Sequence, residues 1–151
     1  MIKGLIFDLD GTLLNTIKDI GDSVNAMLED YGFKTHSIDE YRLMVGNGFN
    51  DLIYKALPSS ASENKQLEGL EKFLYYYNLN YMNSSLPYDG IVELLKELEK
   101  RGIKLGVNSN KREDYTVSLL EAYLKDIHFI KVVGQKDQPK KPDPLGARQI
   151  I

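Results

Sequence analysis

The 151-residue chain contains no cysteine. This absence excludes a disulfide framework and any metal site built from thiolates, and it suits a reducing compartment, so we expect a cytoplasmic protein. Long apolar runs are also missing, because the stretch from Ile2 to Phe7 is broken at Lys3 and Gly4 and stopped by Asp8. Such a segment is too short for a membrane-spanning helix or for the apolar region of a signal peptide, and we expect no membrane association.

The chain also lacks an excess of positive charge. Its 19 Lys and Arg residues are outnumbered by 22 Asp and Glu residues, which gives a formal net charge of −3. A mildly acidic chain does not offer the broad basic surface that nucleic-acid binding needs, so we expect no nucleic-acid partner. The apolar content of 42% and charged content of 27% are those of a globular protein and exclude a disordered or fibrous one.

The order of apolar patterns predicts an α/β fold with a parallel sheet. Three short apolar segments indicate strands: the first ends at Phe7, the second covers 103–107 and the third covers 128–133. Helical spacing follows Asp89, which we expect to cap a helix that ends at Gly102, and it returns between the second and third strands. Strands that alternate with helices in this way are typical of right-handed crossovers in a parallel sheet.

A long helical insertion follows the first strand. Residues 16–83 show helical spacing only, with Asn15 or Thr16 as the expected cap of the first helix and a capping-box sequence from Ser37 to Glu40. We therefore predict a Rossmann-like core formed by 1–15 and 84–151, with a helical cap domain formed by 16–83.

Two carboxylates stand directly after the first strand. Asp8 and Asp10 are two residues apart, so the strand period would place both on one side at the carboxyl edge of the sheet, where open α/β sheets bind ligands. Carboxylates this close repel each other, so either one is protonated or a cation is recruited. Gly11 permits a sharp turn and Thr12 adds a hydroxyl donor. The alternative interpretation is a simple Asp-Gly turn.

A second polar cluster, 108–112, follows the second strand. The hydroxyl of Ser109 and the backbone N–H of Asn110, at the expected start of a helix, are donors that suit a phosphate group. Lys141 supplies a compact positive charge, and Lys140 could substitute for it. Taken singly, Ser109 is typical of a turn and Lys141 of a solvated surface. In this order after the two aspartates, they indicate a phosphate site.

The segment Asp8-Leu-Asp-Gly-Thr12-Leu13 resembles the first motif of the haloacid dehalogenase-like phosphohydrolases, and the rest of the chain is similar to their phosphoglycolate phosphatase branch. This resemblance implies that Asp8 is the nucleophile, that Asp10 is the general acid and base, and that both hold Mg²⁺. It matches Ser109 to the second motif and Lys141 to the third.

The same resemblance covers the helical insertion. The segment Gly46-Asn47-Gly48-Phe49 resembles the substrate-facing loop of the family's cap. The implied activity is Mg²⁺-dependent hydrolysis of a small phosphorylated metabolite through an aspartyl-phosphate. A hexose-phosphate mutase or another phosphatase of the same branch stays open, because cap residues decide the specificity.

One family motif has no match. Relatives commonly carry Gly-Asp-x-x-x-Asp after a fourth core strand, and its carboxylate completes the Mg²⁺ site, but nothing after Lys141 fits it. A catalytically impaired truncated fragment, or a non-catalytic interaction module, is therefore the alternative. In relatives the first strand is central, so we expect Leu5–Phe7 to lie on an open sheet edge, covered by a missing C-terminal segment or by a second copy in a homodimer.

Overall fold

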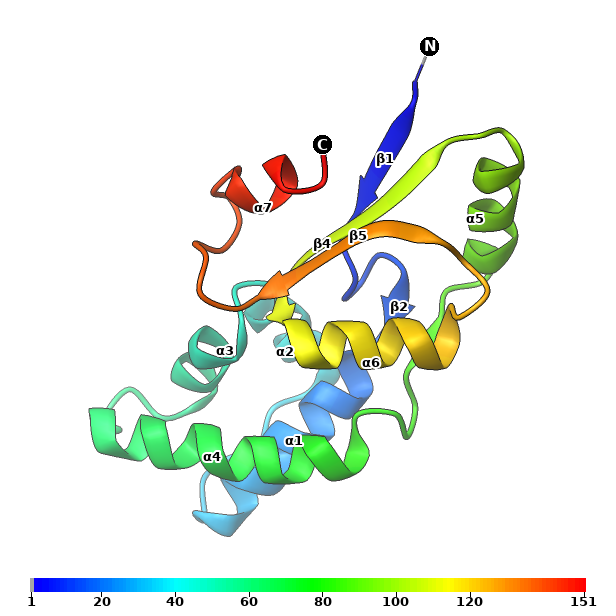
Figure 1. Cartoon of the computed structure of the whole chain (residues 1–151). Helices are drawn as coiled ribbons and strands as arrows, with labels where there is room; N and C mark the ends of the chain where they lie inside the picture. The colour runs from blue at the N-terminus through cyan, green and yellow to red at the C-terminus, as the bar shows by residue number, and fades with distance from the viewer. Residues whose placement is uncertain (1) are drawn as a thin grey trace. The chain divides into compact units, whose positions relative to one another are not determined.

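The structure, a computed structural model, describes residues 2–151, and these form two compact units. The first unit contains the residues up to 15 together with 86–151, and the second contains residues 16–85. Each unit has its own secondary structure and its own core, labelled along the chain in Figure 1.

The first unit is built on a parallel sheet, as the sequence predicts. Its order is β1-β4-β5, and the strands are Gly4–Phe7, Lys104–Arg112 and Phe129–Gln135. In the pairing of β1 with β4, Phe7 lies opposite Val107. The strands β4 and β5 are also parallel and pair as far as Arg112 and Gln135. The α/β fold class is thus confirmed.

The central strand is longer than predicted. The polar cluster after Val107 continues β4 to Arg112, and the next helix, α6, spans Glu113–Tyr123. The expected helix start at Asn110 is therefore wrong. The reason lies in the pairing with β5, which holds both ends of this polar segment, because Asn108 lies opposite Val133 and Arg112 opposite Gln135, with an irregularity between them.

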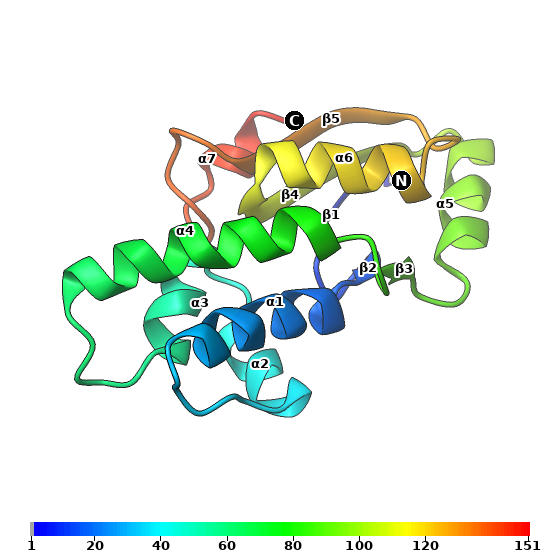
Figure 2. The same cartoon turned by 90° about the horizontal axis from the view of Figure 1, so that it is seen from below.

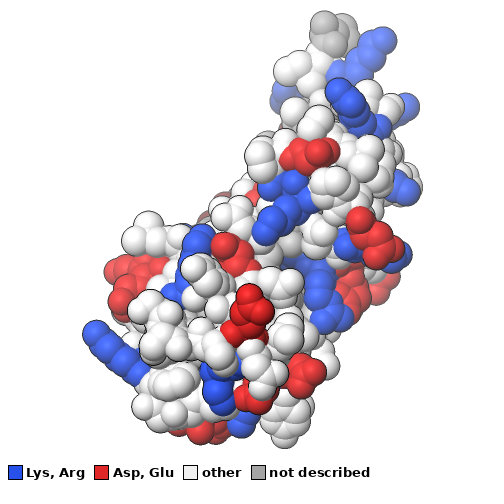
Figure 3. All heavy atoms as spheres, turned by 90° about the vertical axis from the view of Figure 1, so that its left-hand side faces the viewer, with Lys and Arg blue, Asp and Glu red and all other residues white. Residues whose placement is uncertain are grey.

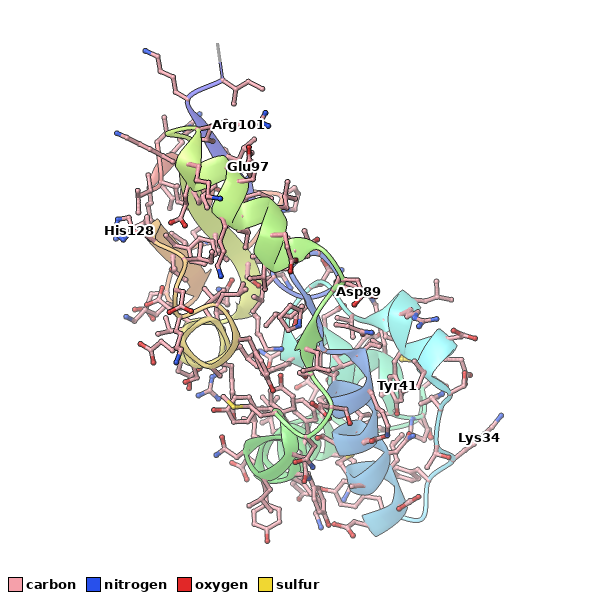
Figure 4. The ribbon with its side chains drawn as sticks, turned by 90° about the vertical axis from the view of Figure 1, so that its right-hand side faces the viewer. Lys34, Tyr41, Asp89, Glu97, Arg101 and His128 are labelled. Atoms are coloured by element: carbon pink, nitrogen blue, oxygen red, sulfur yellow. The ribbon has the colours of Figure 1, made fainter. Side chains whose placement is uncertain are left out.

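The other helices of the first unit are α5, Ile91–Lys100, and the short α7, Leu145–Arg148. We predicted that Asp89 (Figure 4) is the N-cap of α5, and this prediction is wrong. Gly90 takes the N-cap position, with a left-handed φ of 82°. Glu97 and Arg101 form an exposed ion pair of 2.9 Å at the C-terminal end of α5 (Figure 4).

The segment around α7 packs on one face of β4. A Cβ added at Gly106 would lie 2.4 Å from Cγ2 of Ile150, and one added at Gly146 would lie 2.7 Å from Oδ1 of Asn108. A side chain at either position would collide with Ile150 or Asn108, so glycine lets these two side chains pack against the backbone. Strand β1, which pairs with β4, forms an edge of the sheet, as predicted, and Ile6 is 40% exposed.

A small second sheet in the first unit was not predicted. Strands β2, Leu14–Asn15, and β3, Leu86–Pro87, pair antiparallel, with Asn15 opposite Leu86. These are the residues at which the chain leaves the first unit and returns to it. A strand of two residues is too short to show the alternation of apolar and polar residues, so the sequence pattern could not predict these strands.

The second unit is helical. Figure 2 shows its helices, and its buried core draws on all of them: Ile20, Val24, Met27, Leu28, Tyr41, Leu52, Ile53, Phe73 and Tyr77. The helices are α1 Ile17–Asp30, α2 Ile38–Met44, α3 Phe49–Ala56 and α4 Glu63–Asn80. The capping box of Ser37 and Glu40 is confirmed. Thr16 takes the N-cap position of α1, as predicted, but within the described residues its side chain makes no capping hydrogen bond.

A buried carboxylate joins the two ends of the second unit. Asp19, in the first turn of α1, is 2% exposed. It accepts hydrogen bonds from the backbone N–H groups of Ser84 and Ser85, and from the Ser85 hydroxyl at 2.7 Å. The segment after α4 is therefore fixed to the beginning of α1.

We expect Asp19→Asn to lower the free energy of unfolding by about 1–3 kcal/mol, because the amide nitrogen cannot accept the hydrogen bonds that the second carboxylate oxygen accepts. Urea denaturation of the whole chain measures the change. The matched control is Asp22→Asn on the same helix, where the carboxylate is about half exposed and pairs with Lys18. The control should change stability by less than about 0.5 kcal/mol, and an equal effect of the two substitutions would contradict the role of Asp19.

Candidate active site

The chain turns sharply after β1 and presents two carboxylates. The backbone N–H groups of Leu13 and Leu14 donate to the carbonyl of Leu9, at 3.0 and 3.1 Å. Gly11 has a φ of 78°, a left-handed conformation that glycine adopts without strain. Leu9 is fully buried, whereas the side chains of Asp8 and Asp10 on either side of it are 41% and 16% exposed. The alternation expected for these two aspartates is present in their burial.

Lys141 binds the first carboxylate. Its Nζ atom lies 2.9 Å from Oδ1 of Asp8 and 2.8 Å from the backbone oxygen of Asn108, at the continuation of β4. The loop after β5 thus returns its ammonium group to the end of β1. This placement brings together two residues that the sequence indicated separately.

The second carboxylate binds a lysine that the sequence interpretation did not select. Nζ of Lys111 lies 3.0 and 3.3 Å from the two carboxylate oxygens of Asp10. The Lys111 side chain is 0% exposed. A buried ammonium group is costly unless it is paired, so this contact fixes both partners. The polar cluster 108–112 contained the signal, since Lys111 follows Ser109 at the strand period of two.

Ser109 and Asn110 lie beside these pairs on β4. Ser109 is 4% exposed, and its hydroxyl accepts a hydrogen bond from the N–H of Lys111 at 3.1 Å. The Asn110 side chain accepts from the backbone N–H of Lys141 at 2.7 Å and donates to its carbonyl at 3.3 Å. Asn110 therefore acts on the lysine loop through its side chain, whereas we predicted a role for its backbone N–H. Thr12, also a predicted phosphate contact, is exposed in the turn after Asp10.

The predicted cap loop belongs to the second unit. Gly46, Asn47 and Gly48 connect α2 to α3, with positive φ values of 133° and 90° at the two glycines. Phe49 is the first residue of α3, and its ring centroid lies 4.9 Å from that of Phe73 and 5.3 Å from that of Tyr77. Phe49 thus contributes to the aromatic core of its own unit. A role for this loop toward substrate stays a prediction.

The charges at the carboxyl edge of the sheet balance. Two carboxylates face two ammonium groups, and within residues 2–151 there is no group of three His, Asp or Glu side chains able to enclose a metal ion. Mg²⁺ commonly takes one or two carboxylates and completes its shell with water and substrate phosphate oxygens. Asp8 and Asp10 fit such a partial site.

Comparison with known proteins identifies the family. The family model described as haloacid dehalogenase-like hydrolase matches residues 5–151. The chain belongs to the haloacid dehalogenase-like hydrolases. It is 33% identical over 148 residues to a phosphoglycolate phosphatase of Pseudomonas syringae pv. tomato, and 34% identical over 156 residues to one of Mesorhizobium japonicum. These matches cover 94% and 97% of this chain but only 54% and 66% of the relatives.

Solved structures of this hydrolase family show the same fold. A crystal structure from Haemophilus somnus, described as a predicted phosphoglycolate phosphatase, superposes with a TM-score of 0.87 at 28% identity. The match covers 98% of this chain and 69% of that one. The fold and the family are therefore shown over nearly the whole chain. The chain itself spans between about half and two thirds of the length of these two curated relatives.

Two further features concern the surface and the helices of the chain. The face in Figure 3 carries Lys and Arg together with Asp and Glu. Among the described residues, no helix is long and apolar enough to cross a bilayer.

We expect Asn110→Ala to release the Lys141 segment, because both hydrogen bonds to the backbone of Lys141 are lost. The free energy of unfolding should fall by about 1–3 kcal/mol, and the Lys141 amide should exchange its hydrogen faster than in the unsubstituted chain. Amide exchange followed by NMR measures this. Asn64→Ala, which removes an exposed amide from α4, is the control. Unchanged exchange at Lys141 in Asn110→Ala would contradict the anchoring role.

Proposed function

We propose that this chain carries the active site of a Mg²⁺-dependent phosphomonoester hydrolase of the phosphoglycolate phosphatase type. The observation that carries the proposal is the contact of Lys141 with Asp8, since it places a cation on the carboxylate that the family resemblance makes the nucleophile. A phosphoryl group in transfer carries negative charge on its oxygens, and a fixed cation beside the attacking atom stabilises that charge.

In the first step, an ionised oxygen of Asp8 attacks phosphorus. The bond from phosphorus to the ester oxygen breaks, and the leaving oxygen takes a proton from Asp10. The products of this step are an alcohol and an aspartyl-phosphate on Asp8. Lys141 and the Ser109 hydroxyl supply the charge and the hydrogen bond that hold the phosphoryl oxygens, with further donors in the turn at Gly11 and Thr12.

In the second step, water attacks the aspartyl-phosphate and gives its proton to Asp10. The bond between phosphorus and the Asp8 oxygen breaks, which releases inorganic phosphate and restores both side chains. Asp8 and Asp10 would hold Mg²⁺, which when bound neutralises charge on the phosphate and the attacking carboxylate. This sequence needs one general acid and base, and Asp10 is the carboxylate next to Asp8 in the turn.

The substrate class is inferred from the relatives and the helical unit. The relatives named above are phosphoglycolate phosphatases, which supports a small phosphorylated metabolite as substrate. We assign the choice of leaving group to the loop from Gly46 to Phe49. A cytoplasmic location is part of the same proposal, and the absence of cysteine supports it because it suits a reducing compartment.

We expect the chain to hydrolyse phosphoglycolate and p-nitrophenyl phosphate when Mg²⁺ is present, and to lose this activity in EDTA. Asp8→Asn should lower turnover on the order of 10³-fold or more, because an amide does not replace the nucleophile. Release of inorganic phosphate measures both effects.

The control is Asp89→Asn, which removes an exposed carboxylate before α5 (Figure 4) and should leave turnover unchanged. Turnover by Asp8→Asn at the unsubstituted rate would refute the assignment of the nucleophile. A folded chain without turnover under any condition would favour the non-catalytic alternative.

A further inference from the structure

The two lysines of the site differ in their freedom to move. The Lys141 side chain is 31% exposed, so its ammonium group can turn from Asp8 toward an incoming anion. Lys111 projects from the central strand, and its side chain is 0% exposed. Its ammonium group contacts both oxygens of Asp10. Because no water reaches it, Lys111 cannot leave Asp10 without losing the compensation of a buried charge.

We propose that Lys111 is a fixed internal counterion of Asp10 that makes Mg²⁺ and phosphate bind together and disfavours Mg²⁺ alone. The proposal rests on the proposed function only in that both use the same pocket. The role of Lys111 follows from the contacts described above.

The charge count of the pocket explains the coupling. When both carboxylates are ionised, Asp8 and Asp10 contribute −2, and Lys111 and Lys141 contribute +2, so the four side chains are neutral together before any ligand enters. Mg²⁺ alone would leave an uncompensated +2 next to two ammonium groups, and a phosphate dianion alone would leave −2. The two ions together restore neutrality, so each raises the affinity of the pocket for the other.

The burial of Lys111 makes the effect specific to this residue. An exposed lysine could swing into solvent when a cation arrives, and its repulsion would then be screened. Lys111 stays in place, and Asp10 keeps a partner that already satisfies part of its charge. Replacement of Lys111 by methionine keeps a long side chain in the buried space but removes the positive charge.

The test measures binding without turnover. Isothermal titration gives the Kd of MgCl₂ for the whole chain, with and without inorganic phosphate at constant ionic strength, corrected by a titration of MgCl₂ into phosphate alone. In the unsubstituted chain we expect phosphate to tighten Mg²⁺ binding about 10-fold or more. In Lys111→Met we expect Mg²⁺ alone to bind about 10-fold more tightly, with most of the phosphate dependence lost.

Two variants serve as controls. Lys111→Arg keeps the positive charge and should keep the coupling between Mg²⁺ and phosphate binding. If Lys111→Met fails to fold, a loss of this coupling in folded Lys111→Arg would contradict the proposal. Lys104→Met removes an exposed lysine at the start of the same strand and should leave both affinities unchanged.

The proposal is overturned if phosphate does not change the Mg²⁺ affinity of the unsubstituted chain, or if Lys111→Met binds Mg²⁺ alone no more tightly. Either result is independent of catalysis. Coupled binding without any hydrolysis would refute the proposed function and support the role of Lys111.

Discussion

The parallel pairing of β1 with β4 is the constraint on which the site depends. Phe7 lies opposite Val107, so the residues that follow each of them meet at the same end of the sheet although they are a hundred positions apart in the sequence. The strand β4 continues past this point, and its pairing with β5 carries it to Arg112. Without the first register, Lys111 would not reach Asp10, and the carbonyl of Asn108 would not be available to Lys141.

Two different devices position the two cations. Lys111 is held by burial in the central strand and by its contact with Asp10, in a stretch bounded by the ladder pairs of Asn108 and Arg112 with β5. Lys141 sits in a loop, and the side chain of Asn110 fixes it by binding its backbone on both sides. A loop residue is thereby given a defined place without being buried, which suits a group that must exchange a carboxylate partner for an anion.

The sequence predicts much of this architecture, for identifiable reasons. Short apolar segments and helical spacing were enough for the parallel core and the helical insertion, and the Asp8 to Thr12 motif was enough for the family. The predictions fail where backbone pairing overrides side-chain character. The cluster at 108–112 is polar, so it resembled the end of a strand, yet β5 pairs with it to Arg112. The same error hid Lys111, because the period of two that links it to Ser109 applies only when the cluster is interpreted as a strand. Gly90 replaced Asp89 as a cap because a left-handed turn can begin a helix without a capping side chain.

The pairing of Asn15 with Leu86 has a consequence for how such a protein can diversify. The chain leaves the first unit after Asn15 and returns to it at Leu86, and these two residues lie opposite each other in the pairing of β2 with β3. Both strands belong to the first unit. An inserted segment therefore needs only two neighbouring ends, a condition that Asp19 meets inside the helical unit by joining α1 to Ser84 and Ser85. Inserts of other lengths and folds could be grafted at the same junction while the aspartates and lysines keep their places. In related proteins with this junction, the inserted unit can therefore change completely while the side chains at the carboxyl edge of the sheet stay the same.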